Sequence, residues 1–358
     1  MDWNWIESLT LGVVQGLTEF LPISSDGHLT ITQHAFEYAS GRKSTAADKI
    51  FFDVMLHVGT LLAILVHYRR DGAEGAKGLL GSEAVPPAFR RSAVIRTGLL
   101  AIVATLPLIP DKLFFMDAIE KAFESLTFTG VGFLITAAIL LVTLRLKGGE
   151  KGPRESTFLD ALLVGVAQMF APLPGVSRSG LTISAALALG FSRTWAVGFS
   201  LLMAVLAITG ATVFELRKIN PATLSGDRVA QIVASAALAG VIGYLAITWL
   251  VRLVRSGRIW YFSVYLVVLG VAMIAVDQFK GGRADVRPAH AVDRPDRVGP
   301  PTPGDRAGLA LGAGPLAGPV ADGPGTGGRG PGPLGRGAGA GPGLVLGAGL
   351  DGHDRRSP

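Results

Sequence analysis

The stretch ESLTLGVVQGLTEFLPISSDG, residues 7 to 27, has a second copy later in the chain, DALLVGVAQMFAPLPGVSRSG, residues 160 to 180. Aligned without gaps, the copies coincide at Leu9/Leu162, Gly12/Gly165, Val13/Val166, Gln15/Gln168, Ser24/Ser177 and Gly27/Gly180. Chance similarity is the alternative, because shared apolar, glycine-rich composition inflates such matches. The pattern favours an internal repeat, and we therefore expect a fold of two related halves.

Both copies lie in apolar regions that are interrupted in the middle. Proline, serine and glycine break residues 5 to 35 and 158 to 190 into pieces shorter than the roughly 20 apolar residues of a bilayer span. Irregular backbone at membrane depth is tolerated only where it is buried in protein or lines a wet cavity. The two regions therefore predict re-entrant helical hairpins beside a cavity.

The composition indicates a membrane protein. Of the 358 residues, 49% are hydrophobic and 17% are charged, and the mean hydropathy is +0.45. Stretches long and apolar enough to cross a bilayer are residues 51 to 68, 94 to 110, 125 to 145, 193 to 215, 229 to 250 and 259 to 277. The predicted fold class is an all-α polytopic membrane protein with six transmembrane helices and two re-entrant hairpins.

The order of the spans predicts how the hairpins are related. Three predicted spans separate the two copies, so the second hairpin is expected to enter from the opposite face in an inverted-topology repeat. The working site of such a repeat is expected near the midplane, where the copies meet. The more basic loops, near residues 69 to 91, 147 to 154 and 252 to 258, are expected in the cytoplasm by the positive-inside rule.

Charge and cysteine content exclude several classes of function. The net charge of +6 is explained by the basic loops, and no basic cluster is interleaved with aromatic residues, so nucleic acid is not an expected partner. The chain has no cysteine, which excludes disulfides, thiolate metal sites and a cysteine nucleophile. Its first ten residues lack the basic and small-residue pattern of a signal peptide.

The end of the chain has a different composition. Residues 281 to 358 are rich in Gly, Pro, Ala and Arg and lack Lys, Glu, Ile, Phe, Tyr, Trp, Met, Asn and Gln. Such a segment cannot build a hydrophobic core. We expect an integral membrane domain over residues 1 to 280 and a disordered low-complexity tail over residues 281 to 358.

Polar residues of the first hairpin are costly in a bilayer. Gln15 and Glu19 are four residues apart and share a helix face. An intramembrane carboxylate such as Glu19 indicates function, the alternative being a cap on a neighbouring helix. Near Ser25, His28 can act as a general acid or base, or can be a satisfied structural group.

Both hairpins contain a predicted helix start, PISSDGH at residues 22 to 28 and PGVSRSG at residues 174 to 180. Serine hydroxyls and free backbone N–H groups at a helix start bind anions, or the serines simply cap the helix. In the second hairpin Arg178 can bind phosphate bidentately, or can pair structurally with Glu19 or Asp160. Together the hairpins favour phosphoryl chemistry, which depends mainly on positioning and charge neutralisation.

Another polar pair lies within the span at residues 51 to 68. Asp53 and His57 are four residues apart there, so they either line the same cavity or bond to each other. We interpret the pair as support for the site rather than as part of the chemistry.

The sequence resembles the bacterial undecaprenyl-diphosphate phosphatase family, also called the bacitracin-resistance family. The resemblance is carried by QGLTEFLPISSDGH at residues 15 to 28 and PGVSRSG at residues 174 to 180, and it extends from residue 5 to about residue 278. It implies six spans and two re-entrant hairpins in an inverted repeat. It also implies hydrolysis of undecaprenyl diphosphate to the monophosphate and inorganic phosphate, which recycles the lipid carrier of peptidoglycan and other envelope polymers.

The resemblance also implies which residues form the site. The catalytic residues are Glu19, Ser25, His28 and Arg178, with either Ser25 or His28 as the nucleophile. The substrate-binding residues are Ser24, Gly27, Gly175, Ser177 and Ser179. Gln15 and Glu19 are the expected ligands of a divalent cation, Mg²⁺ or Ca²⁺.

The expected partner is a polyprenyl diphosphate lipid, and the expected location is the bacterial inner (plasma) membrane, with the multi-pass protein's active site facing the outer side. The resemblance allows a homodimer. A lipid-phosphate transporter or flippase is the alternative function, since inverted repeats with broken helices also build transporters. A serine, a histidine, a carboxylate and an arginine together favour the enzyme.

Three positions depart from the family pattern. Asp26 stands where Ser or Thr is typical, which puts a negative charge beside Ser25 that either repels a diphosphate or holds the metal. Leu206 replaces a proline in FSLLMAVLAITGA, residues 199 to 211, and Gly198 just before it replaces a glutamate, so this helix is expected to pack differently.

Overall fold

The two sequence copies form two pairs of short helices in the computed structural model, which describes residues 4–41, 46–110, 114, 116–217 and 225–284. The first pair is α1 (Trp5–Thr18) and α2 (Ser25–Ser40), and the second is α8 (Phe158–Gln168) and α9 (Arg178–Ala188). At about 1.5 Å per residue, none of the four is as long as the roughly 30 Å hydrocarbon core of a bilayer. The chain therefore forms a helical hairpin at each predicted place.

The six predicted spans correspond to six longer helical segments. The main helices are α3 (Ala46–His67), α5 (Arg91–Thr105), α7 (Leu126–Val142), α10 (Arg193–Leu216), α11 (Gly226–Arg255) and α12 (Tyr261–Ala284). Five segments are long and apolar enough to cross a membrane alone, and the sixth, in α3, qualifies together with the helix that follows it. The described residues contain no strand, only an isolated bridge between Lys151 and Phe191. The chain is an all-α polytopic membrane protein.

Several segments differ from the sequence prediction, among them the short helix α6 (Met116–Phe123) between two predicted spans. Part of the basic region expected as a loop forms α4 (Arg69–Leu79), at a 71° bend from α3. Its Arg, Ala, Glu and Lys residues favour a helix, and Lys77 pairs with Glu74 at 2.7 Å. At the other end of the chain α12 continues to Ala284, four residues into the predicted tail, and the rest of that tail lies outside the described residues.

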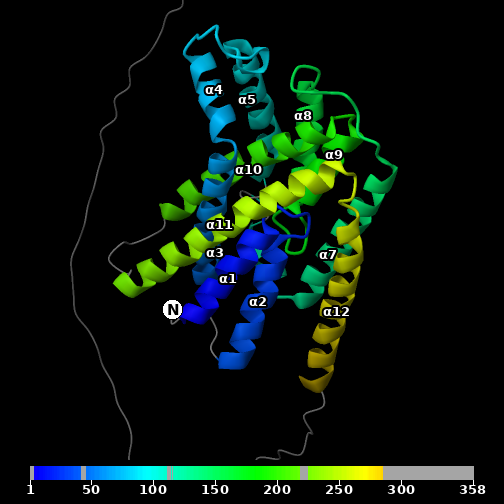
Figure 1. Ribbon diagram of the computed structural model, residues 1–358. Coiled ribbons are helices and arrows are strands. Elements are labelled where there is room, and N and C mark those ends of the chain that lie inside the picture. Colours follow the sequence, from blue (N-terminus) through cyan, green and yellow to red (C-terminus); the bar gives the residue numbers. More distant parts are fainter. Residues whose placement is uncertain (1–3, 42–45, 111–113, 115, 218–224, 285–358) are drawn as a thin grey trace, which may run out of the picture. The chain divides into compact units, whose positions relative to one another are not determined.

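Helices from the two halves of the chain exchange partners. The first helix of each hairpin packs on a long helix of the other half, α1 on α11 and α8 on α5. The long helices follow the same rule, because α3 packs on α11 and α10 packs on α5, while α7 runs beside α12 (Figure 1). Each of these contacts has a counterpart in the other copy, as expected for two related halves, and the inverted topology stays a prediction.

Glycines allow these helices to approach closely. A Cβ atom at Gly130 of α7 would lie 2.7 Å from the carbonyl oxygen of Gly270 on α12, and the reverse distance is also 2.7 Å. At the α3–α11 contact, a Cβ at Gly59 would collide with the carbonyl oxygen of Ala236. Small residues at such crossings are typical of membrane helices, whose association depends on close packing.

We expect Gly59→Ala to destabilise the protein strongly, because α3 and α11 must separate to admit the methyl group. Overpacking of this kind costs about 1–3 kcal/mol or more. Gly210→Ala on α10 is the matched control, because a Cβ there meets no atom within 4 Å. Thermal unfolding of the purified proteins in detergent should show a lower Tm for the first variant alone. Equal Tm values would contradict the close α3–α11 contact.

Candidate active site

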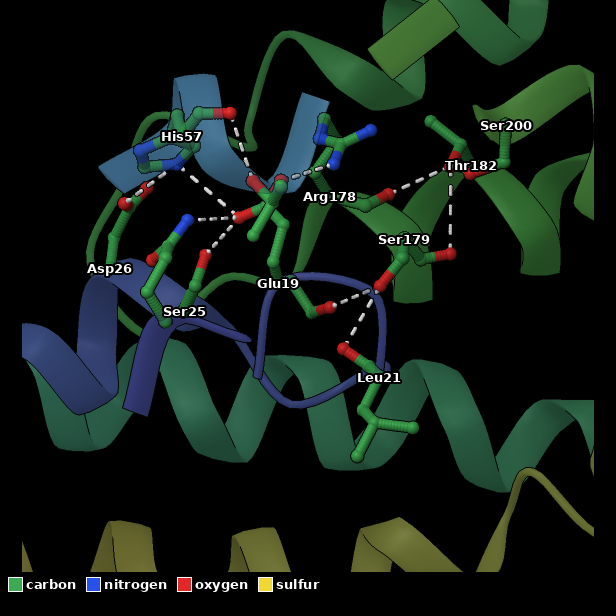
Figure 2. Close-up of polar contacts among 12 residues, drawn as sticks. Glu19, Leu21, Ser25, Asp26, His57, Arg178, Ser179, Thr182 and Ser200 are labelled. Carbon is green, nitrogen blue, oxygen red and sulfur yellow. Dashed lines mark hydrogen bonds and ion pairs between the residues drawn. The ribbon is translucent and has the colours of Figure 1, made fainter. Parts of the chain in front are cut away.

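The two hairpins meet where their helices are interrupted. In the first hairpin α1 ends with Glu19 as its C-cap, and in the second α9 begins at Arg178 after the N-cap Ser177. The Ser179 hydroxyl donates a hydrogen bond of 3.1 Å to the carbonyl oxygen of Leu21, which joins the two loops directly (Figure 2). As predicted, polar residues of the two sequence copies come together.

The Glu19 carboxylate is the centre of this site (Figure 2). It is buried, with the residue 5% exposed. Its Oε1 accepts from Arg178 Nη2 at 2.6 Å, and its Oε2 accepts from Ser25 Oγ at 2.7 Å. Oε2 also lies 3.0 Å from Gln15 Nε2 and 3.3 Å from His57 Nε2. Hydrogen-bond donors and positive charge around both oxygens favour the ionised form of this carboxylate.

Arg178 combines both interpretations that the sequence left open. It forms the structural ion pair with Glu19, whereas Asp160 pairs with Lys151 at 3.1 Å. Its second terminal nitrogen, Nη1, is buried and has no hydrogen-bond partner in the described part of the chain. A buried guanidinium nitrogen without an acceptor is costly, so Arg178 keeps an unused donor suited to an anion.

Ser25 is the first residue of α2, and its hydroxyl hydrogen points to Glu19 rather than to solvent. The residue before it, Ser24, caps the helix by accepting from Gly27 N at 3.3 Å. Ser24 has φ 68°, the one positive φ of a non-glycine residue among the described residues. Such strain is found mainly where a fixed geometry matters, and here it turns the chain so that Ser25 faces the carboxylate.

The predicted substrate-binding residues mainly shape the hairpins. Ser177 caps α9 by accepting from Gly180 N at 3.1 Å, as Ser24 does for α2. Gly27 and Gly175 lie against α7, where a Cβ atom would collide with Phe133 at the first position and with the Thr129 backbone at the second. These contacts, like that of Ser179 with Leu21, position the two helix starts without a ligand.

His28 points away from the carboxylate, toward α7 and α12. Its Nδ1 lies 2.7 Å from the carbonyl oxygen of Ser24, and its Nε2 lies 2.7 Å from the hydroxyl of Tyr265. The ring also stacks on Tyr265 and contacts the edge of Phe133. Of the two predicted nucleophiles, Ser25 is the one in contact with a carboxylate.

His57 of α3, interpreted from the sequence as support for the site, lies directly beside the site carboxylates. Its Nε2 lies 3.3 Å from Glu19 and 3.9 Å from Asp26 Oδ1. The expected partner Asp53 binds the ring only through its backbone carbonyl, 2.7 Å from Nδ1, while its carboxylate accepts from Gln33 at 2.9 Å. The sequence feature that pointed to His57 is that it and Asp53 are ionisable residues inside an apolar span, where such residues usually indicate function.

The predicted metal ligands do not offer a free set of oxygens in this arrangement. Both Glu19 oxygens already accept from protein donors, and Gln15 presents its amide nitrogen to them. Gln15 Oε1 remains, buried and without a hydrogen-bond partner. The described residues contain no group of three or more His, Asp or Glu side chains placed to hold an ion. Gln15 Oε1 is thus the one oxygen of this pair left for a cation, and Gln15 and Glu19 as metal ligands stay a prediction.

Comparison with known proteins relates the chain to one family. Residues 8–272 match the family model of bacitracin resistance protein BacA. The chain is 38% identical to an undecaprenyl-diphosphatase of Carboxydothermus hydrogenoformans over 275 residues, which cover 76% of this chain and 97% of the relative. It is 35% identical to an undecaprenyl-diphosphatase of a Nocardioides species over 276 residues, 76% of this chain and 96% of the relative.

A third relative matches a similar part of the chain. The undecaprenyl-diphosphatase of Korarchaeum cryptofilum is 38% identical over 274 residues, which cover 75% of this chain and 98% of that protein. The matched region contains the interruptions of both hairpins, all the site residues described above and the first half of α12. The chain therefore belongs to the family of the bacitracin resistance protein BacA.

Proposed function

We propose that this protein hydrolyses undecaprenyl diphosphate to undecaprenyl phosphate and inorganic phosphate. The observation that carries the proposal is the 2.7 Å hydrogen bond from Ser25 Oγ to Glu19, next to the unused Nη1 of Arg178. A hydroxyl whose proton already points to a carboxylate is suited to nucleophilic attack. An arginine with a spare donor is suited to hold the phosphoryl group under attack.

In the first step Arg178 binds oxygens of the terminal phosphate, which weakens its pairing with Glu19 and makes that carboxylate a better proton acceptor. Ser25 Oγ forms a bond to the terminal phosphorus, and its proton moves to Glu19. The bond between that phosphorus and the bridging oxygen breaks. Undecaprenyl phosphate leaves with the bridging oxygen, and positive charge from Arg178 stabilises the transition state.

In the second step water attacks the phosphoserine. The bond between phosphorus and Ser25 Oγ breaks, and Glu19 returns the proton to that oxygen. Inorganic phosphate departs with the oxygen of the water molecule. In this scheme His28 orients the start of α2 through its contact with the Ser24 carbonyl, and Ser25 is the nucleophile.

A lipid-phosphate transporter is the alternative that uses the same pair of hairpins. Transport needs a site that binds the diphosphate and releases it unchanged. It has no need of a serine hydroxyl hydrogen-bonded to a buried carboxylate. The Ser25–Glu19 contact therefore favours hydrolysis.

The cellular setting completes the proposal. The substrate is a polyprenyl diphosphate lipid that enters from the bilayer, and the membrane is the bacterial inner membrane, with the site facing its outer side. Recycling the lipid carrier there supports peptidoglycan synthesis and resistance to bacitracin. A divalent cation, Mg²⁺ or Ca²⁺, and a homodimer stay predictions, and no step above depends on either.

Turnover in detergent tests the function, because it needs no second compartment. The purified full chain is expected to release inorganic phosphate from undecaprenyl or farnesyl diphosphate. Rapid acid quenching with substrate labelled in the terminal phosphate should trap label on Ser25. Label in an acid-labile bond at His28 would reverse the assignment of the nucleophile. A folded protein that releases no phosphate from either lipid would overturn the function itself.

A further inference from the structure

We infer that His57 is a positioning residue that holds Glu19 toward Ser25 and neutralises Asp26, so that a carboxylate can stand beside Ser25 without repelling a diphosphate. This inference rests on the proposed phosphatase function. His57 and Asp26 then act as a coupled pair, in addition to Ser25, Glu19 and Arg178 of the proposed mechanism.

The contacts of the His57 ring determine its charge. Nδ1 faces the backbone carbonyl of Asp53 at 2.7 Å, and a carbonyl oxygen can only accept. Nε2 faces the carboxylates of Glu19 and Asp26 at 3.3 and 3.9 Å, and ionised carboxylates also only accept. Both nitrogens therefore carry hydrogen, and His57 is an imidazolium cation. The anchor at Asp53, one turn earlier on α3, keeps Nε2 directed at the two carboxylates.

Asp26 needs such a partner because of where it lies. It is the second residue of α2, directly after Ser25, and its side chain is 31% exposed. The side chains of Glu19, Arg178 and His57 are 3%, 16% and 19% exposed. Asp26 is thus the most accessible of the four charged groups, and its charge is the one that an approaching anion meets first.

The Glu19 and Asp26 carboxylates thus face two basic side chains, Arg178 and His57, while the nearby Asp53 carboxylate is held by Gln33. Without His57, two carboxylates beside Ser25 would share Arg178, which the substrate must also use. Like charge near a bound diphosphate weakens binding, and the effect is large where burial limits screening by water. His57 therefore affects both substrate affinity, through Asp26, and the chemical step, through Glu19.

Four proteins separate these two effects: the full-length wild type, Asp26→Ser, His57→Gln and the double variant, assayed for phosphate release from farnesyl diphosphate. His57→Gln is expected to raise KM at least tenfold and to lower kcat at least fivefold. Asp26→Ser is expected to leave KM within threefold of the wild type. In the double variant KM should return to within threefold of the wild type while kcat stays low, because only the charge at Asp26 has been removed.

A second variant tests the charge directly. His57→Lys keeps a positive charge without the ring and is expected to hold KM within threefold while lowering kcat. If His57 only supported the fold, His57→Lys would not lower kcat while leaving KM unchanged. This test with lysine remains possible if His57→Gln fails to fold. His67→Gln is the matched control on α3, and it should change neither constant.

The inference is overturned if His57→Gln changes KM by the same factor whether residue 26 is Asp or Ser. Unchanged kcat in a folded His57→Gln protein would overturn the positioning of Glu19. Calorimetry of inorganic pyrophosphate binding to the same four proteins distinguishes failure of this inference from failure of the proposed function. If the wild type has no turnover, that function fails, while the coupling between Asp26 and His57 is still read from the pyrophosphate Kd values.

Discussion

Replacing Glu19 with glutamine is expected to lower kcat by about three orders of magnitude, within the range of about 10²–10⁴ that a general base contributes. The glutamine can still accept a hydrogen bond from Ser25, but it cannot take up the proton. KM should change by only a few-fold, because Arg178 remains to bind the phosphate. Steady-state phosphate release from farnesyl diphosphate measures both constants.

Stability must be followed in the same experiment, because Glu19 is the buried partner of two cations. Removing one member of a buried ion pair costs about 3–5 kcal/mol, so the Tm in detergent should also fall. Glu215→Gln is the matched control, since Glu215 is a buried glutamate of α10, outside the group around Glu19. It should retain full activity. A folded Glu19→Gln protein with more than half of the wild-type kcat would rule out Glu19 as the base.

Substituting Arg178 with lysine should reduce kcat/KM by about 10²–10³, the loss typical of removing one preorganised donor to developing charge. Lysine keeps the positive charge and can still meet Glu19, but it lacks the planar pair of nitrogens that serves the carboxylate and the phosphate together. Both constants should change, with kcat falling by a larger factor than KM rises. Inorganic phosphate should also inhibit this variant less strongly than the wild type.

Arg193→Lys is a closely matched control for this prediction. Like Arg178, Arg193 is the first residue of a helix that follows a serine N-cap, but it donates to the carbonyl oxygen of Arg255. Its replacement should leave kcat/KM within about twofold. If both lysine variants lose activity equally, Arg178 contributes to helix packing rather than to phosphate binding.

The helical segments could be predicted because a bilayer restricts the backbone so strongly. Lipid supplies no hydrogen bonds, so long apolar stretches must become helices, and breaks must lie inside protein. The six segments and both interruptions follow from this restriction. The helix α4 does not, because a polar, glycine-containing segment outside the apolar stretches carries no such constraint and its helix depends on local side-chain preferences.

The candidate site was predictable to the extent that its residues are close in sequence. Gln15, Glu19 and Ser25 lie within one hairpin, and Arg178 occupies the matching loop of the second copy. The contact of His57 with Glu19 could not be predicted, because it depends on how α3 packs against that hairpin. Similarly, His28 lies three residues after Ser25, yet its ring turns toward Tyr265 of α12.

By itself, the sequence determined that this chain is a membrane protein with two broken helical hairpins that carry complementary polar groups. Hydrophobicity, proline and serine act locally, and their consequences follow from residue order alone. The tertiary structure decided the partners: Glu19 with Arg178 and His57, and Asp26 beside the same His57. These pairings depend on glycine-mediated approach of helices far apart in sequence, because only that packing brings Nε2 of His57 within hydrogen-bonding range of a carboxylate on another element.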